Sequence, residues 1–130
     1  MTSTMRMVYG LLAAVGPMAC APDNAEPDLS AARGEKLYLQ KCASCHGVDG
    51  KGGSAPDLTT LSAQNRGIFP RNFVMSVIDG FNRRDHPNSV MPEFGNEDLG
   101  PTVQVEDGGA TTPTPSDLIA LAAYLESIQR

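Results

Sequence analysis

The chain has 130 residues, with ten Lys and Arg against fifteen Asp and Glu, a net charge of −5 and 41% hydrophobic residues. That length allows one domain, and the composition is that of a folded protein rather than a disordered one. Because no stripe of Lys and Arg is available to follow a phosphate backbone, nucleic acid is excluded as a partner. Three cysteines are too few for a disulfide framework.

The first nineteen residues have the layout of a secretory signal peptide. Arg6 is the only charged residue before Asp23, and a short apolar run follows it at residues 7–15. A basic start, an apolar middle and a small-residue exit are typical of export signals. The run is shorter than the ~20 apolar residues that a membrane-spanning helix needs. We therefore expect residues 1–19 to be removed on export to the periplasm.

Cys20 stands at the end of this segment, directly after Ala19. The arrangement resembles a bacterial lipoprotein signal, in which the cysteine is acylated and becomes the first residue of the mature protein, although Pro17 departs from that pattern. Two interpretations stay open: an acylated Cys20 that anchors the protein to a membrane, and plain cleavage near Ala19 or beyond. Residues 20–29 contain two prolines and three acids, which predicts a flexible tether before a domain at 30–130.

Two helical patterns occur in the first half of that domain. Ser30 precedes a run to Lys41 in which the apolar residues share one side, so Ser30 is expected to be the N-cap. The four glycines and one proline of residues 46–57 predict a loop. Residues 71–79 have apolar side chains at helical spacing, and Gly80 is expected to end that helix.

The last helix has the strongest pattern of the chain. Thr114 is predicted as its cap and Pro115 as its first residue, and its buried stripe is predicted to be Leu118, Leu121, Ala122, Leu125 and Ile128. The polar residues 95–113 before it are expected to form a long loop. Since no segment alternates convincingly with period two, the sequence predicts an all-α domain.

The sequence Cys42-Ala43-Ser44-Cys45-His46 carries the strongest chemical signal. Two thiols three positions apart lie on one side of a helical turn, where they can form thioethers with the two vinyl groups of one haem. The adjacent imidazole of His46 then reaches the iron. This C-x-x-C-H spacing is typical of c-type haem attachment, which takes place outside the cytoplasm. The sequence therefore predicts one covalently bound haem c.

Three other interpretations of the two cysteines are weaker. A thioredoxin-type C-x-x-C requires a βαβ context, and no strand is predicted before Cys42. A structural zinc site requires four ligands, of which only His86 is available as the fourth, and Cys45 with its neighbour His46 is an awkward pair on one tetrahedral ion. A disulfide between Cys42 and Cys45 leaves His46 unexplained.

The sixth ligand of a haem iron is sought among two methionines and one histidine. Met75 lies inside the predicted second helix, where it is expected to fill the core. Met91 precedes Pro92 in an irregular segment, where a thioether can fold over the haem face and the proline stiffens the loop. His86 is the rival ligand, five residues earlier. We expect Met91 to be the ligand and His86 to be a surface imidazole.

Taken together, these features resemble those of class I c-type cytochromes from bacteria, from about Ala31 to Gln129. Gly34 and Tyr38 match the positions through which the family's first helix crosses its last, and the matching positions of the last helix are Leu121, Tyr124 and Leu125. The resemblance implies a fold of three to four helices around the haem. It also implies that the carbonyl of Pro56 accepts a hydrogen bond from His46, which fixes the orientation of the imidazole.

Two further expectations concern the surroundings of the haem. Phe73, Phe81 and Phe94 are candidates to line it, because the chain has few aromatic residues to form a core without a cofactor. The stretch from Glu93 to Pro113 departs from the family, whose small members connect the Met-Pro loop to the last helix in a few residues. A long loop of this kind is more often functional than idle.

The sequence thus predicts a one-electron carrier that exchanges electrons with redox-partner proteins in the periplasm or at a membrane surface. His46 and Met91 leave no open position on the iron, so catalysis on a substrate is not expected. Two alternatives are kept: an electron-transfer subunit of a periplasmic dehydrogenase or oxidase complex, and a gas-binding haem protein.

Overall fold

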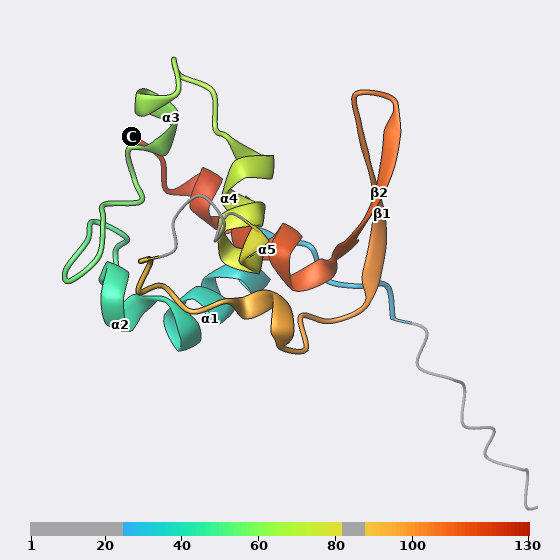
Figure 1. Ribbon diagram of the computed structural model, residues 1–130, viewed down its shortest axis with the longest axis horizontal. Helices are drawn as coiled ribbons and strands as arrows, with labels where there is room; N and C mark the ends of the chain where they lie inside the picture. The colour runs from blue at the N-terminus through green and yellow to red at the C-terminus, as the bar shows by residue number, and fades with distance from the viewer. Residues whose placement is uncertain (1–24, 82–87) are drawn as a thin grey trace, which may run out of the picture.

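A computed structural model describes residues 25–81 and 88–130. Figure 1 shows a body of helices from which a single β-hairpin stands out at one end of the long axis. The elements, in chain order, are α1 (Ala31–Lys41), α2 (Ala43–His46), α3 (Leu61–Gln64), α4 (Arg71–Asp79), the 3₁₀ turn η2 (Phe94–Asn96), β1 (Thr102–Asp107), β2 (Ala110–Pro115) and α5 (Ser116–Ser127). None of the helices in the described ranges is long and apolar enough to cross a membrane.

Helix α1 begins where the sequence predicts. The side chain of Ser30 accepts a hydrogen bond from the backbone N–H of Arg33. This bond satisfies one of the N–H groups that the first turn of a helix leaves without a backbone partner. The guanidinium of Arg33 then donates from Nε and from an Nη atom to the two carboxylate oxygens of Asp117, at 3.0 and 2.9 Å. This two-point ion pair joins the first turn of α1 to the first turn of α5.

The predicted crossing of the first and last helices is confirmed. A Cβ atom on Gly34 would overlap the carbonyl oxygen of Ala120 and would stand 2.8 Å from the Cβ of Tyr124. One turn further along, the ring of Tyr38 packs against that of Tyr124 with centroids 5.1 Å apart. The backbones of α1 and α5 approach this closely because position 34 has no side chain.

Helix α4 covers the other side of α5 and occupies its predicted range, with Gly80 in the left-handed conformation at its C-terminus. Its buried side chains, Val74 and Ile78, belong to one apolar cluster with residues of the helices α1 and α5 and of the segment 94–99. The remaining buried members of this cluster are Leu37, Tyr38, Phe69, Phe94, Leu99, Leu118, Ala120, Leu121 and Leu125. The cluster is the core of the protein.

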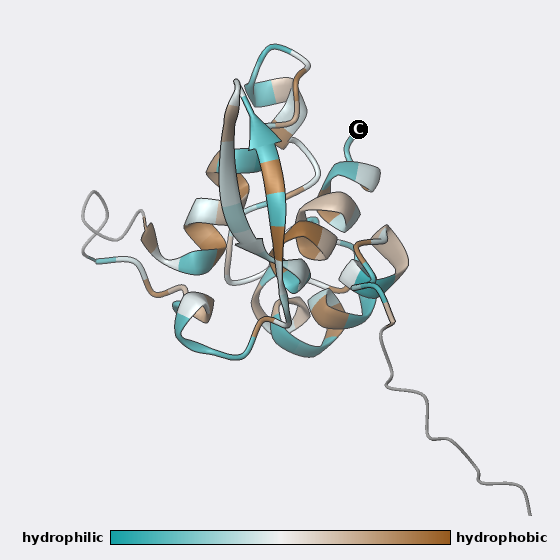
Figure 2. Ribbon diagram, turned by 90° about the vertical axis from the view of Figure 1, so that its right-hand side faces the viewer, coloured by the Kyte–Doolittle hydropathy of each residue, from teal (hydrophilic) through white to brown (hydrophobic). Residues whose placement is uncertain are grey.

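The expectation that residues 95–113 form a loop is wrong, because most of this stretch is a β-hairpin. Its strands are antiparallel, and Gly108 and Gly109 form the turn with φ of 59° and 87°, which is the two-residue turn that suits the twist of a hairpin. Figure 2 shows hydrophobic and hydrophilic residues alternating along β1. In β2 the segment Ala110–Pro115 is polar and contains Pro113 and Pro115, so it lacks the apolar alternation by which a strand is predicted.

The hairpin also corrects the start of the last helix. Thr114 and Pro115 are the last residues of β2, and α5 begins at Ser116. The backbone N–H groups of Ser116 and Asp117 donate to the carbonyls of Pro101 and Leu99, at 2.9 and 3.0 Å. These bonds satisfy donors of the first turn of α5, so no side-chain cap is needed. The single-turn helices α2 and α3 were not predicted as separate elements.

Candidate functional site

The C-x-x-C-H sequence follows α1 directly, with Cys42 as the N-cap of α2 and the other four residues forming that helix, at the end of the molecule opposite the hairpin (Figure 1). His46, its last residue, is 8% exposed, and its Nδ1 lies 2.9 Å from the carbonyl oxygen of Pro56. Because a carbonyl only accepts, Nδ1 carries a proton and donates it, so Nε2 is the ring nitrogen that the neutral imidazole offers to a metal ion. This is the contact that the resemblance implied for Pro56 and His46.

The loop after α2 is held by further hydrogen bonds. The hydroxyl of Tyr38 donates to the carbonyl of Gly47 at 2.6 Å, and the N–H of Gly52 donates to the carbonyl of His46 at 2.9 Å. The N–H of Ala55 donates to the carbonyl of Cys45 at 3.1 Å. The loop therefore returns past α2, and this path brings Pro56 to the His46 ring.

An apolar cleft lies between α1, α4, α5 and the segment that contains Met91. It is lined by Tyr38, Cys42, His46, Leu58, Leu61, Phe73, Val74, Val77, Ile78, Met91, Leu121 and Leu125. None of these lining residues is an acid, a Lys or an Arg. An apolar ligand with a flat body would therefore find hydrophobic side chains from several elements, and the only strong metal ligands on the walls are the His46 ring and the two sulfur side chains.

The two cysteines of the motif differ in their environments. Cys42 is partly buried and lines the cleft, whereas Cys45 is exposed and is not among the lining residues. Burial raises the pKa of the Cys42 thiol to about 11, so at neutral pH it is a protonated thiol. The reactive cysteine of a thioredoxin-type motif has a lowered pKa instead, which argues against that interpretation.

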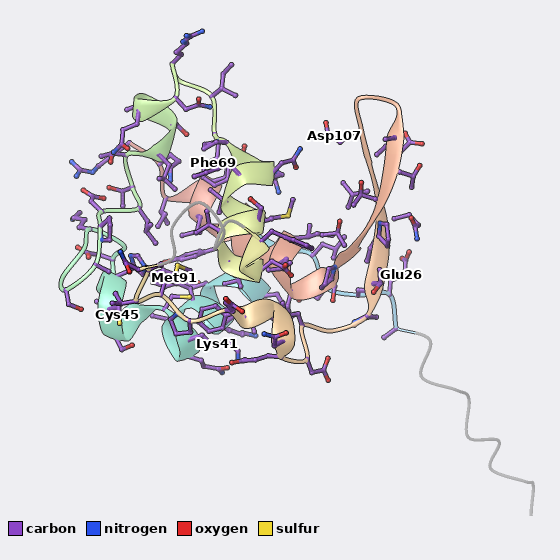
Figure 3. The ribbon with its side chains drawn as sticks, in the orientation of Figure 1. Glu26, Lys41, Cys45, Phe69, Met91 and Asp107 are labelled. Carbon is purple, nitrogen blue, oxygen red and sulfur yellow. The ribbon has the colours of Figure 1, made fainter. Side chains whose placement is uncertain are left out.

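Met91 lines the cleft from the segment between α4 and η2, which is not helical at this residue. It is partly buried, it packs against the core, and it lies at the same end of the molecule as Cys45 and Lys41 (Figure 3). Met75, the other methionine that was considered, lies on α4 among residues that face the hairpin. His86 lies outside the described residues. The structure thus brings Met91 and His46 to one cleft.

The three phenylalanines expected around a haem have different places. Phe73 lines the cleft, and it is 55% exposed. Phe81 follows the end of α4 and is 78% exposed beside the hairpin, outside the cleft. Phe94 lies in the core, 8% exposed, with the ammonium of Lys41 5.9 Å from its ring centroid. Neither Phe81 nor Phe94 is among the residues that line the cleft, because α4 ends before Phe81 and η2 turns Phe94 inward.

Most of the cleft walls could not be predicted from the sequence. The wall residues that were expected only as helix faces, or not singled out at all, are Leu58, Leu61, Val74, Val77, Ile78, Leu121 and Leu125. Helical spacing identified Val74 and Val77 as one face of α4, yet spacing does not distinguish a face that packs on protein from a face that lines a cleft. Leu61 belongs to a single turn with no periodic pattern.

The zinc interpretation finds no support in the part of the chain that the structure describes. No three His, Cys, Asp or Glu side chains gather there to hold a metal ion. The fourth zinc ligand considered, His86, is outside that part.

A comparison with families of known proteins identifies the family of this chain. The model of the family described as cytochrome c matches residues 31–129. The matched range begins with the first residue of α1, ends two residues beyond α5, and includes α2, the cleft and the hairpin.

Proposed function

The chain belongs to the cytochrome c family, so it is an electron-transfer protein with covalently attached haem c, and we propose that it holds one haem, with His46 and Met91 as the axial ligands of the iron. The observation that supports this proposal is the cleft, whose walls include Cys42, His46 and Met91 among apolar side chains. The family is typically one of electron carriers, and the proposed role is one-electron transfer between redox-partner proteins rather than catalysis.

The residues of the cleft fit the group that the family binds. Cys42 on the wall and the exposed Cys45, three residues further along the same motif, are the two thiols for covalent attachment. The Nε2 of His46 is free to bind iron because Nδ1 is occupied by the Pro56 carbonyl. When bound, the haem supplies an iron that alternates between the ferric and ferrous states. The apolar walls suit the body of a porphyrin, and Phe73 would lose part of its exposure against it.

The side chains of this protein determine what that iron can do. Pro56 holds the His46 imidazole in one orientation and raises its basicity through the hydrogen bond to Nδ1. Met91 would occupy the remaining axial position with a soft thioether, which favours the ferrous state and raises the reduction potential. If His46 and Met91 both hold the iron, a substrate would have no site on the metal, and electron exchange would need little rearrangement of these two side chains.

We also propose a place for the protein in the cell: a class I, monohaem bacterial cytochrome exported to the periplasm and anchored to a membrane by an acylated Cys20. The described chain begins near the hairpin, at the end of the molecule away from α2 (Figure 1). A flexible tether that leaves from the hairpin end would be attached far from α2, so it would leave α2 uncovered. Partner proteins in the periplasm would then have access to Cys45 and its surroundings.

The central test of this proposal is whether haem stays on the chain after denaturation. The protein is expressed with an export and haem-attachment system, separated by denaturing electrophoresis and stained for haem. Wild type is expected to give a stained band, and the double variant Cys42→Ala/Cys45→Ala is expected to give none. The variant Cys20→Ser is the control, since it removes a thiol outside the motif and should keep the stain. A wild-type band without haem would refute covalent attachment.

A further inference from the structure

The hydrogen-bond pattern of the hairpin determines which backbone groups face outward. Asp107 and Ala110 flank the two-residue turn, so they form a hydrogen-bonded pair, and such pairs alternate along an antiparallel ladder. The bond from the N–H of Ser116 to the carbonyl of Pro101, at 2.9 Å, continues the same alternation at the base. The residues between the bonded pairs, whose N–H and C=O groups point away from the partner strand, are Thr102, Gln104 and Glu106 in β1 and Thr111, Pro113 and Pro115 in β2.

The two outer edges of the hairpin therefore differ. On β2, Pro113 and Pro115 have no N–H to donate, which protects that edge from pairing with another strand. On β1, all three outward residues have an N–H group and exposed side chains. Within the described ranges, no hydrogen bond joins these three amides to another segment. The amides of the β1 edge are thus available to a further strand, while the tip of the hairpin is held to α4 by a hydrogen bond from the Asn72 side chain to Asp107.

We propose that this edge pairs with the β1 edge of a second copy of the chain, antiparallel about a two-fold axis at Gln104. In this register Gln104 faces Gln104 of the other copy, and Thr102 faces Glu106. Every outward N–H and C=O group of the three residues then finds a partner. Both copies use the same surface, as a closed two-fold dimer requires.

The side chains favour this occupant and this register. No two like charges face each other, because each Glu106 stands opposite a threonine. On the other face of the strand, Val103 of one copy stands opposite Val105 of the other, and both valines are only partly buried in the single chain. The register shifted by two residues, with its axis at Glu106, would place two carboxylates directly opposite each other. The charge pattern therefore disfavours the axis at Glu106, and the axis at Gln104 pairs each of the three outward residues with another of the three.

The dimer is expected to be concentration-dependent, because an edge-to-edge contact between two strands is small compared with the interfaces of permanent dimers. Its test is the mass of the haem-loaded protein in solution, carried as Cys20→Ser so that no acyl chain is attached, measured by light scattering after size-exclusion chromatography from micromolar to millimolar concentration. The mass of this protein is expected to rise from that of one chain toward that of two. A mass of one chain at every concentration would overturn the proposal.

A matched pair of proline variants identifies the edge. Gln104→Pro removes an outward N–H of β1, and Thr111→Pro removes an outward N–H of β2, so neither removes a bond within the hairpin. Gln104→Pro is expected to stay monomeric, whereas Thr111→Pro is expected to associate like wild type. Equal behaviour of the two variants would overturn the assignment of the dimer to the β1 edge.

A second pair of variants keeps the test decisive if a proline disturbs the hairpin itself. Thr102→Lys would place an ammonium opposite Glu106 of the other copy and is expected to strengthen association several-fold. Thr102→Glu would place a carboxylate there and is expected to weaken it by a similar factor, with both effects reduced by salt. If the two variants associate equally, the proposed register is wrong. The haem assignment does not depend on any of these results.

Discussion

Gly34 of α1 lies against the backbone of α5, where a Cβ atom would overlap the carbonyl oxygen of Ala120. The obstacle is a main-chain atom inside a helix, so it cannot move aside as the end of a flexible side chain can. The close crossing of α1 and α5 therefore requires a residue without a side chain at position 34. Helix α2 follows α1 directly, so its position also depends on this crossing.

The first prediction follows from this contact. Gly34→Ala is expected to lower the free energy of unfolding of the haem-loaded protein by about 1–3 kcal/mol, and Gly34→Leu by more, because the helices must separate to admit the side chain. Denaturant titration measures the change. The control is Ala32→Leu, which enlarges an exposed residue of the same helix and should cost much less. Equal losses at the two positions would mean that the crossing does not limit the space at Gly34.

The second prediction distinguishes Met91 from His86 as the axial ligand. A thioether on ferric haem gives a weak far-red charge-transfer band that two imidazoles do not give. Met91→Ala is expected to abolish this band, to allow carbon monoxide to bind, and to lower the reduction potential by ~0.1 V or more within the ~0.8 V that axial ligands span.

The matched control for the axial ligand is His86→Ala, which is expected to leave the band unchanged. The opposite pattern, in which His86 is essential and Met91 is not, would identify a cytochrome with two histidine ligands and a low potential. If wild type itself binds carbon monoxide readily, a gas-binding role would replace electron transfer.

The third prediction concerns the tether. If Cys20 is acylated, Cys20→Ser is expected to move the protein from the membrane fraction to the soluble periplasm, because several acyl chains hold a protein firmly where one holds it only marginally. Cell fractionation with a haem stain shows where the protein is. A soluble wild type whose N-terminus lies beyond residue 20 would refute the anchor and leave the haem assignment intact.

The fourth prediction concerns alkaline pH. Burial raises the pKa of Tyr38 to about 12, whereas an unfolded tyrosine titrates near 10. The folded state therefore favours the neutral phenol, so this contribution to stability is complete below about pH 10 and is lost as the pH rises toward about 12. Tyr38→Phe is expected to make the free energy of unfolding depend less on pH across this range.

The same variant has a second, separate effect at neutral pH. Tyr38→Phe removes the hydrogen bond to the Gly47 carbonyl, which is expected to cost about 1 kcal/mol at pH 7. Tyr124→Phe keeps that bond and should cost less there. If Tyr38→Phe shows an unchanged pH dependence between pH 10 and 12, the Tyr38 hydroxyl does not titrate with folding.

The features that the sequence by itself determined depend on neighbouring residues in the chain. The N-cap at Ser30, the end of α4 at Gly80 and the spacing of Cys42, Cys45 and His46 each depend on residues within about one helical turn, so short-range rules suffice to predict them. Gly34 was predicted at the helix crossing through its place in a family pattern. The alternation of β1 and the Gly108-Gly109 turn were also present in the sequence, but a strand is recognised most easily when its partner alternates too.

The tertiary structure decided the features that join distant segments. Residues 110–115 become a strand because β1 pairs with them and α5 continues directly from them, even though two prolines and four polar or small residues give no strand pattern. Phe73, Phe81 and Phe94 are the same type of residue, yet of the three only Phe73 lines the cleft. The direction in which a side chain points depends on where its helix ends and what packs behind it, and this information is spread over the whole chain.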